Sequence, residues 1–413
     1  MRVIVLGAGV IGTATAYWLV RDGHEVTVLD RQPGAGLETS FANGGQISAS
    51  HAEPWANPAT PAKVLRWLGR KDAPLLWRWR LDPALWAWGL RFLANCTPGR
   101  TRINTERTLR IALYSRTLLK ALRAETGIEY DQRSEGILHL YRDGREFDLA
   151  VKAAAAMRAM GLERRVLDPA ACVRLEPALA QAKLIGGIHS PEDESGDAHL
   201  FTQRLAVLAQ ERGATFRYAT RIEAIETEAG RLCAIRTDQG RLACQTAVLA
   251  LGSFSTGLAK SLGFTLPVVP AKGYSVTLPA GPGAPKMSLT DDELKMVYSR
   301  LGERLRIAGT AEFAGLDAAI DPLRARLLLD RALGLLPQAG DPAKAQYWAG
   351  LRPVTPDSVP ILGPSPIAGL FLATGHGTLG WTMSVGTGRF MADLVGGKRP
   401  EIDPKGLGID RFG

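Results

Sequence analysis

The first thirty residues constrain the fold of this chain more than any other stretch. A short apolar strand is followed by Gly7, Gly9 and Gly12 in the order G-x-G-x-x-G, and an amphipathic helical pattern begins there. A second apolar strand then ends at Asp30. Strand, glycine turn, helix, strand and terminal acid in this register predict a βαβ unit that binds a dinucleotide.

Each conspicuous residue of this unit has a physical task. Gly7 permits a tight turn, Gly9 lets the backbone approach a pyrophosphate, and Gly12 allows the helix to pack closely on the strand. The helix N-terminus offers free N–H groups to the phosphates. Asp30, followed by Arg31, is placed to accept a hydrogen bond from a ribose hydroxyl and to repel a 2′-phosphate. This stretch alone leaves NAD and FAD open.

Composition excludes several classes of protein. The chain has 413 residues, enough for two or three domains, and 46% hydrophobic residues, enough for a large core. The net charge is +9, yet no block of five consecutive basic residues occurs, so we expect no nucleic-acid partner. No run of eighteen apolar residues is present, so no membrane-spanning helix is expected.

The four cysteines are scattered, with no CxxC pair and no Cys/His cluster at metal-ligand spacing. We therefore expect no metal site and no disulfide framework. Cys233 and Cys244 could face each other on a hairpin, which the sequence leaves open.

Later segments alternate helical and strand patterns. Helices are predicted over 103–125, 146–161 and 321–336, and an antiparallel meander with turns at 229–230 and 239–240. A buried strand closing at Gly252 predicts a second approach to the nucleotide. Alternating strands from residue 268 onward predict a separate antiparallel sheet.

Residues 64–93 contain five of the nine tryptophans, interspersed with arginine and lysine. One interpretation is an amphipathic surface that rests in a membrane interface, with tryptophan at headgroup level. The other is a pair of helices whose tryptophans pack inward, as aromatic side chains also do in soluble helices. Both interpretations stay open at this point.

Five segments in order carry a family resemblance: "VIVLGAGVIG" with Asp30, "ETSFANGGQIS", "KGYS", "GLRPVTPDSVPILGP" and "GHGTLGWTM". The chain resembles the FAD-dependent D-amino-acid oxidoreductases, the fold group of glycine oxidase and D-amino-acid oxidase. Within that group it looks like the small-subunit type of D-amino-acid dehydrogenase. The dinucleotide motif is widespread, whereas the last two segments are far more particular, and the likeness runs along nearly the whole chain.

The resemblance implies an α/β fold with a Rossmann-like FAD-binding domain and a second, α+β domain for the substrate, built on an antiparallel sheet. We expect residues 1–55, 196–262 and 346–413 in the FAD-binding domain, and 56–195 with 263–345 in the substrate-binding domain. The FAD is expected to be noncovalent, since no histidine or cysteine stands in an attachment motif.

The resemblance also implies a reaction. A D-amino acid would lose its α-hydrogen as hydride to FAD, and the imino acid would hydrolyse to a 2-oxo acid and ammonia. Electrons would pass to a quinone or another acceptor, on the cytoplasmic side and peripherally on the inner membrane, with 64–93 as a possible contact. Such enzymes are thought to need no strong general base, and no His–Asp or paired-carboxylate constellation stands out here.

Three other interpretations stay open from the sequence. An oxidase of the same fold would act on glycine, sarcosine or D-proline-like amines with oxygen as acceptor. A soluble NAD-dependent dehydrogenase and a non-catalytic FAD-binding module are the others.

Site residues follow from the resemblance position by position. Arg352 matches the arginine that grips the substrate carboxylate, a task for which a planar, permanently charged guanidinium is suited. Ser48, His51 and Tyr274 are further candidates for the catalytic site, and Tyr298 is either a substrate contact or an ordinary sheet tyrosine. His376 either touches the flavin or is structural. The expected cofactor contacts are Gly7, Gly9, Gly12, Asp30, Arg31, Ser40, Asn43, Gly45, Gln46, Ile222, Gly252, His376, Gly377, Thr378, Leu379 and Gly380.

Overall fold

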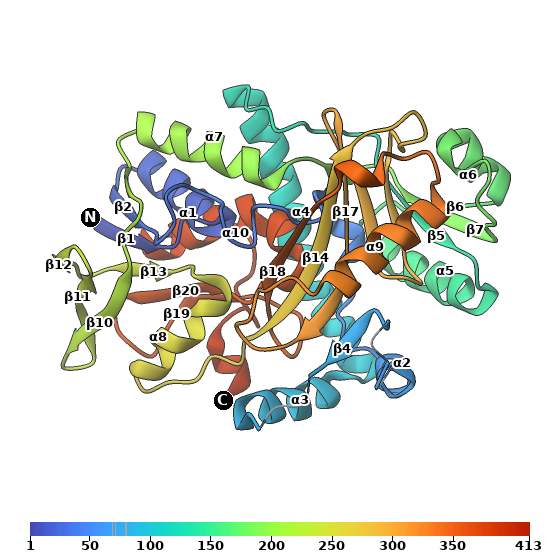
Figure 1. The fold of residues 1–413 in the computed structure, drawn as a ribbon. Helices are drawn as coiled ribbons and strands as arrows, with labels where there is room; N and C mark the ends of the chain where they lie inside the picture. The colour runs from blue at the N-terminus through green and yellow to red at the C-terminus, as the bar shows by residue number, and fades with distance from the viewer. Residues whose placement is uncertain (68, 71, 79–80) are drawn as a thin grey trace.

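The computed structural model describes residues 1–67, 69–70, 72–78 and 81–413. Trp79, one of the five tryptophans in 64–93, lies outside the described residues. Two large sheets lie side by side, each with helices packed against it (Figure 1). This arrangement confirms the predicted α/β fold with a second, sheet-based part.

The first sheet carries the dinucleotide motif. Its strand order is β19-β20-β13-β1-β2-β9, with β1, β2, β9, β13 and β20 parallel and β19 antiparallel to β20. The strands are β1 (Arg2–Leu6), β2 (Glu25–Leu29), β9 (Thr215–Arg217), β13 (Ala247–Leu249), β19 (Ile361–Pro364) and β20 (Leu370–Thr374). Because carboxyl ends of parallel strands share one edge, the turns after β1, β2, β13 and β20 meet there.

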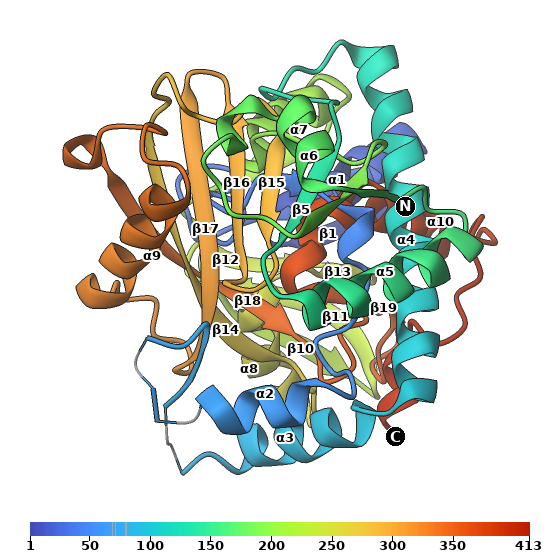
Figure 2. The same ribbon diagram turned by 90° about the vertical axis from the view of Figure 1, so that its right-hand side faces the viewer.

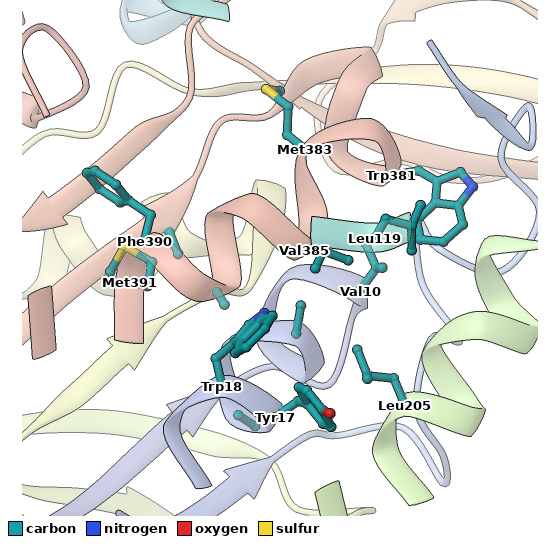
Figure 3. Close-up of a cluster of buried hydrophobic side chains, with 14 of the residues drawn as sticks. Val10, Tyr17, Trp18, Leu119, Leu205, Trp381, Met383, Val385, Phe390 and Met391 are labelled. Carbon is teal, nitrogen blue, oxygen red and sulfur yellow. The ribbon is translucent and has the colours of Figure 1, made fainter. Parts of the chain in front are cut away.

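Helices pack against this sheet through one apolar core. They are α1 (Val10–Arg21), α7 (Ala198–Glu211), α10 (Gly380–Val395) and the long α4 (Pro98–Thr126). Figure 3 shows Tyr17 and Trp18 of α1 between Leu205 of α7 and the side chains of α10. The α1–α10 crossing is close, since a Cβ on Gly388 would lie 2.6 Å from the Ala14 carbonyl oxygen. This crossing fixes both helix N-termini relative to each other.

The second sheet is larger and mostly antiparallel. Its order is β18-β14-β17-β16-β15-β5-β7-β6, and β4 pairs with β17. The strands are β4 (Leu75–Trp77), β5 (Ile137–Tyr141), β6 (Arg165–Leu167), β7 (Gly186–Ser190), β14 (Val269–Pro279), β15 (Ser288–Asp291), β16 (Met296–Leu301), β17 (Arg304–Phe313) and β18 (Gln346–Val354). Two pairs, β15 with β5 and β17 with β4, are parallel. Helix α9 (Pro322–Leu335) covers one face (Figure 2), and the other face lines a cavity.

The remaining elements are short or peripheral. They are α2 (Thr60–Trp67), α3 (Pro83–Asn95), α5 (Gly144–Ala159), α6 (Pro169–Leu175), α8 (Ser255–Ser261), the meander β10 (Ile222–Glu228), β11 (Arg231–Thr237) and β12 (Gly240–Ala243), and the pair β3 (Gln46–Ile47) with β8 (Glu194–Ser195). The predicted meander and its turns are confirmed, with Ala229 and Gly230 both at positive φ. Cys233 lies on β11 and Cys244 directly follows β12, and both are free thiols.

The predicted helices are confirmed with shifted ends. The helix predicted over 103–125 starts five residues too late. In the structure α4 begins at Pro98, and the hydroxyl of Thr97 caps its N-terminus. The predicted boundary at residue 346 does not coincide with the sheets, since β18 pairs with β14 in the second sheet. Residues 64–93 form parts of α2 and α3 joined through β4, so that segment is not a simple helix pair.

We predict that Gly12→Ala weakens folding, because its Cβ would lie 1.9 Å from the Gly7 carbonyl oxygen at the α1–β1 contact. The expected loss in free energy of unfolding is about 1–3 kcal/mol. Gly334→Ala is the matched control, since Gly334 also lies in a helix and a Cβ there would have nothing within 4 Å. Denaturant unfolding of both variants tests this, and equal midpoints would contradict it.

Candidate active site

One cavity of about 1550 Å³ runs between the two sheets. Its wall combines the turns at the carboxyl edge of the first sheet with the inner face of the second sheet. At its far end it reaches tryptophans of α2, β4 and α3. A volume of this size admits a dinucleotide together with a small substrate.

The glycine turn after β1 has the geometry that a pyrophosphate needs. Gly7 has φ +109° and packs against Ala250. Gly12 lies in the first turn of α1, where it packs against the Gly7 carbonyl and does not line the cavity, so the predicted cofactor contact at Gly12 is wrong. A Cβ on Gly9 would meet no protein atom nearer than 3.7 Å, so that its backbone faces open cavity. Gly9 is the N-cap of α1 and brings no capping side chain. The positive end of α1 is therefore available to an anion.

Asp30 directly follows β2 and has two roles. It holds the glycine turn after β1, and it faces the cavity. Its carboxylate accepts the N–H of Ala8 at 2.6 Å and the N–H of Gln32 at 2.8 Å. Burial raises the pKa of Asp30, whereas these two N–H donors oppose the rise. Arg31 stacks over Phe254 at 4.1 Å and pairs with Glu38. Both residues line the cavity at this end.

The loop over 40–48 passes between the two sheets. Ser40 Oγ accepts the N–H of Val10 at 3.1 Å, and Asn43 Oδ1 accepts the N–H of Gly45 at 2.9 Å. Gln46 reaches the second sheet, where its amide donates to Thr290 Oγ1 at 3.0 Å. These bonds hold the loop along the cavity wall.

The late glycine stretch forms a second uncapped helix start. Gly375 and Gly377 have φ +77° and +57°, and no cap side chain precedes α10. His376 is buried, and its Nε2 lies 3.2 Å from Thr387 Oγ1 of α10. Burial lowers the pKa of His376 to about 3, so its ring is neutral. The ring nitrogen therefore braces α10, which favours the structural interpretation of this histidine.

Arg352 of β18 enters the cavity wall without a carboxylate. Its Nη1 donates to the Thr310 carbonyl at 2.9 Å, and no acidic group of the described chain pairs with it. The guanidinium lies directly over Gly273, where a Cβ would be 2.1 Å from Nη1. Burial lowers the pKa of Arg352 to about 10, so it stays charged at neutral pH. A cation held in this way is complementary to a ligand carboxylate.

A bulge in the neighbouring strand provides the carbonyl that holds Arg352. The pairing of β14 with β17 shifts register between Lys272 and Tyr274, which places an extra residue of β17 opposite Gly273. Thr310 stands there with φ +57°, an unusual conformation for a β-branched residue. The bulge thus turns a backbone acceptor toward the guanidinium.

Two predicted tyrosines do not offer their hydroxyls to a ligand. Tyr298 does not line the cavity, and its fully buried ring belongs to the core beneath the second sheet, so the predicted substrate contact is wrong. The face of β16 that carries Tyr298 belongs to the same apolar core as Leu328 and Leu329 of α9, and this core lies on the side of the sheet away from the cavity. Tyr274 lines the cavity, but its hydroxyl donates to the buried Glu312 at 2.7 Å.

The structure brings together a His–Asp pair that the sequence did not reveal. His139 of β5 lies between Ser50 and Asp292, with Nε2 2.9 Å from Ser50 Oγ and Nδ1 2.8 Å from Asp292 Oδ2. All three line the cavity. They are more than eighty residues apart in the chain, so no local motif marks them. The only signal is a buried histidine within the apolar strand "ILHLY".

The remaining predicted residues gather on the same wall. His51 lines the cavity and stacks on His139 with ring centroids 5.0 Å apart. The structure places the following predicted residues in the lining: Gly7, Gly9, Asp30, Arg31, Ser40, Asn43, Gly45, Gln46, Ser48, His51, Ile222, Gly252, Tyr274, Arg352, His376, Gly377, Thr378, Leu379 and Gly380. Two distant glycine turns and Arg352 therefore share one cavity.

This combination defines a dinucleotide-binding oxidoreductase of the two-sheet flavoprotein class. The chain belongs to the DAO family of FAD-dependent oxidoreductases, whose family model matches residues 2–394. FAD dependence, left open by the first thirty residues, is thereby settled against NAD. The uncapped starts of α1 and α10 and the open backbone at Gly9 fit such a cofactor.

Full-length relatives and solved structures agree with this family. The chain is 60% identical to a D-amino acid dehydrogenase of Paramagnetospirillum magneticum, covering 100% of this chain and 99% of the relative. It is 52% identical to one of Dechloromonas aromatica, covering 97% and 98%. Glycine oxidase from Geobacillus kaustophilus superposes with a TM-score of 0.79 at 25% identity, covering 99% and 98%.

We predict that Asp30→Ala lowers the affinity for FAD by about 10- to 100-fold, since a charged acceptor that holds the turn contributes about 1.5–3 kcal/mol. Asp30→Asn keeps one acceptor oxygen, so its affinity for FAD should lie between that of Asp30→Ala and that of the wild type. The measurement is the absorbance ratio at flavin and protein wavelengths after dialysis, with reconstitution of the apoprotein. Full occupancy of Asp30→Ala would contradict the assignment.

Proposed function

We propose that this protein oxidises D-amino acids to 2-oxo acids and ammonia and passes the electrons to a quinone. The observation that carries the proposal is Arg352, a charged guanidinium in the cavity with no acidic partner among the described residues. The names of full-length relatives at 60% and 52% identity support the substrate class. The oxidase alternative has no comparable support at that level of identity.

The residues of the chain would act mainly by orientation. Bidentate pairing with Arg352 fixes the substrate carboxylate, and thereby the direction of the Cα–H bond. The chemistry that FAD supplies when bound is the acceptance of a hydride from Cα. The uncapped start of α10, over Thr378 to Gly380, favours negative charge at the cavity wall. The imino acid then leaves and hydrolyses in water.

A membrane face at α2 and α3 supports the acceptor part of the proposal. Figure 2 shows α2 and α3 together at one end of the molecule, as does Figure 1. On α3, Trp86, Leu90 and Leu93 are exposed by 44%, 70% and 54% and stand at helical spacing. The same side chains line the cavity mouth, which would let an apolar quinone enter from lipid. No helix among the described residues is long and apolar enough to cross a bilayer.

The tryptophans of this region face both ways. Trp88 is buried and donates its Nε1–H to the Val354 carbonyl at 3.1 Å, as the inward-packing interpretation requires. Trp67 and Trp77 line the cavity. The basic side chain of Arg66 stands on α2 beside the exposed Leu65, while Lys63 of the same helix pairs with Glu146. Peripheral contact with the cytoplasmic face of the inner membrane is therefore part of the proposal.

We predict that Arg352→Ala keeps FAD but slows anaerobic bleaching of the flavin by D-amino acids by about 100-fold or more, since two charge-assisted hydrogen bonds are lost. Arg352→Lys keeps the charge but not the bidentate geometry, so its bleaching rate should lie between that of Arg352→Ala and that of the wild type. Bleaching is followed against a panel of D- and L-amino acids, D-proline included. An unchanged rate would remove Arg352 from the substrate site.

We predict that anaerobically reduced enzyme is reoxidised faster by phosphatidylglycerol vesicles carrying a ubiquinone than by air-saturated buffer. Leu90→Asp with Leu93→Asp should reduce co-sedimentation with these vesicles, because two exposed apolar side chains would leave the lipid. Leu323→Asp on α9, where Leu323 is 64% exposed, is the matched control. Rapid reoxidation by air would instead support the oxidase alternative.

A further inference from the structure

A continuous line of hydrogen-bonded side chains runs along the cavity wall and has no part in the proposed orientation of the substrate. Ser48 Oγ lies 2.9 Å from Ser50 Oγ, and Ser50 Oγ lies 2.9 Å from His139 Nε2. His139 Nδ1 lies 2.8 Å from Asp292 Oδ2. All four residues line the same cavity as Arg352. Every member of this line can pass on a proton.

The charge of Asp292 gives the line a direction. Asp292 also accepts the hydroxyl of Tyr141 at 2.9 Å and lies 3.5 Å from Lys295 Nζ. Burial opposes its ionisation, but His139 and Lys295 hold the pKa of Asp292 well below its usual value. A carboxylate only accepts, so Nδ1 of His139 carries a proton, and in the neutral ring Nε2 is the acceptor. Ser50 can then donate to His139, and Ser48 to Ser50.

Backbone contacts hold the two hydroxyls in place. The buried carboxylate of Asp193 accepts the N–H of Ala49 and the N–H of Ser50, each at 3.1 Å. The N–H of Ser48 donates to Thr382 Oγ1 of α10 at 2.9 Å. The start of the line is thus tied to the helix whose N-terminus forms the cavity wall.

The sheet places His139 three strands from β17, the strand whose Thr310 carbonyl holds the Arg352 guanidinium. Ala308, Val297, Thr290 and His139 are successive register partners on β17, β16, β15 and β5, and all four line the cavity. Three strand spacings, about 14 Å, separate the first and last of them. Arg352 and Ser48 line this same cavity, so a zwitterion held by Arg352 would share it with the first hydroxyl of the line.

Other titratable groups near the line are less suited to take a proton. Burial lowers the pKa of His51 to about 3, and burial raises the pKa of Glu53. Besides these and Lys295, the groups that face the line are Asp193, Arg116 beside it, and Arg164 across Tyr141 and Glu53. Asp193 Oδ2 lies 3.5 Å from Ser48 Oγ, farther than the 2.9 Å to Ser50 Oγ, and burial raises the pKa of Asp193. His51, His139 and Asp292 could also be considered as metal ligands, because one ring nitrogen of each histidine and one Asp292 oxygen lie within 4.8 Å of one another. Both nitrogens of His139 are already engaged, so we assign no metal there.

We propose that Ser48, Ser50, His139 and Asp292 form a proton relay that takes the ammonium proton of the bound D-amino acid. The inference rests on the proposed function. The ammonium N–H bond breaks as Ser48 Oγ accepts its proton, Ser48 passes its own proton to Ser50, and Ser50 passes one to His139 Nε2. The Asp292 carboxylate stabilises the imidazolium, and the proton leaves to water beside Lys295, whose side chain is 50% exposed.

The relay meets a requirement of the chemistry. An amino acid reaches the enzyme as a zwitterion at neutral pH, and hydride can leave Cα only when the nitrogen lone pair is free to form the C=N bond. Loss of one proton gives the neutral amine, and loss of hydride to FAD then gives the protonated imine, so charge and electrons balance. Arg352 holds the carboxylate, while the relay removes the proton.

Anaerobic stopped-flow reduction of the holoenzyme by D-alanine across pH is the first test. His139→Gln should slow flavin reduction by about 100-fold at neutral pH. The rate should return toward the wild-type value at pH above the pKa of the free substrate amine, since the substrate then arrives deprotonated. His189→Gln is the matched control, because His189 is a buried histidine of β7 that does not line the cavity.

Calorimetry supplies a readout that needs no hydride transfer. The probe is 2-aminoisobutyrate, which carries an ammonium group but no α-hydrogen and cannot be oxidised. Titration in buffers of different ionisation enthalpy should show proton release on binding to the wild type, and loss of that release in His139→Gln and Ser50→Ala. Both variants are used only if their FAD content equals that of the wild type.

Each contrary outcome overturns the relay in its own way. A rate loss equal at every pH would mean that His139 is structural, and a loss confined to reoxidation by quinone would mean that the line serves the acceptor. Sensitivity of the wild type to a chelator would point to a metal instead. Failure of the proposed function looks different, since no D-amino acid would then bleach the wild-type flavin at all.

Discussion

The crossing of α1 with α10 is the constraint on which the site depends. Each helix follows a parallel strand of the first sheet, and each begins at a glycine turn whose N-cap residue brings no capping side chain, although Ser40 Oγ accepts the N–H of Val10 in α1. Close packing at Gly388 against Ala14 sets the distance between the two helices. Two positive helix ends therefore face one cavity, and an elongated anionic cofactor can meet one at its pyrophosphate and the other at its flavin.

The second sheet depends on small residues in the same way. Gly273 leaves room for the Arg352 guanidinium, and Ala308 presents only a methyl group to the cavity from β17. The other face of the same strands is a core, where Tyr274 and Glu312 pair away from the ligand. Where both faces of a strand are buried, a ligand thus fits against one face only if the side chains on that face are small.

Sequence reasoning succeeded where a function leaves a local pattern. The glycine turn, the strand ending at Asp30 and the "GLRP" segment each place their residues by short-range spacing, and the structure puts Arg352 and Asp30 on one cavity wall. Sequence reasoning failed where interacting residues are far apart in the chain and are brought into contact only by strand pairing. Ser50, His139 and Asp292 belong to three separate elements, and their contact follows from the β15–β5 register, which no local motif encodes. Tyr298 failed for the opposite reason, because period two alone does not say which face is the core.

The two charged features of the substrate site are separated along one sheet, and that separation has a chemical consequence. A cation beside the bound carboxylate raises the cost of keeping a second positive charge on the neighbouring nitrogen, so Arg352 itself favours the neutral amine. The released proton still needs a route from the cavity to solvent. Asp292 follows β15, which lies two strands from β17, where the Thr310 carbonyl holds Arg352. A carboxylate at that distance can receive the charge without competing for Arg352, whereas an acid next to Arg352 would pair with it and block the substrate. The distance between Arg352 and Asp292 thus lets one cavity bind an anion and discharge a proton.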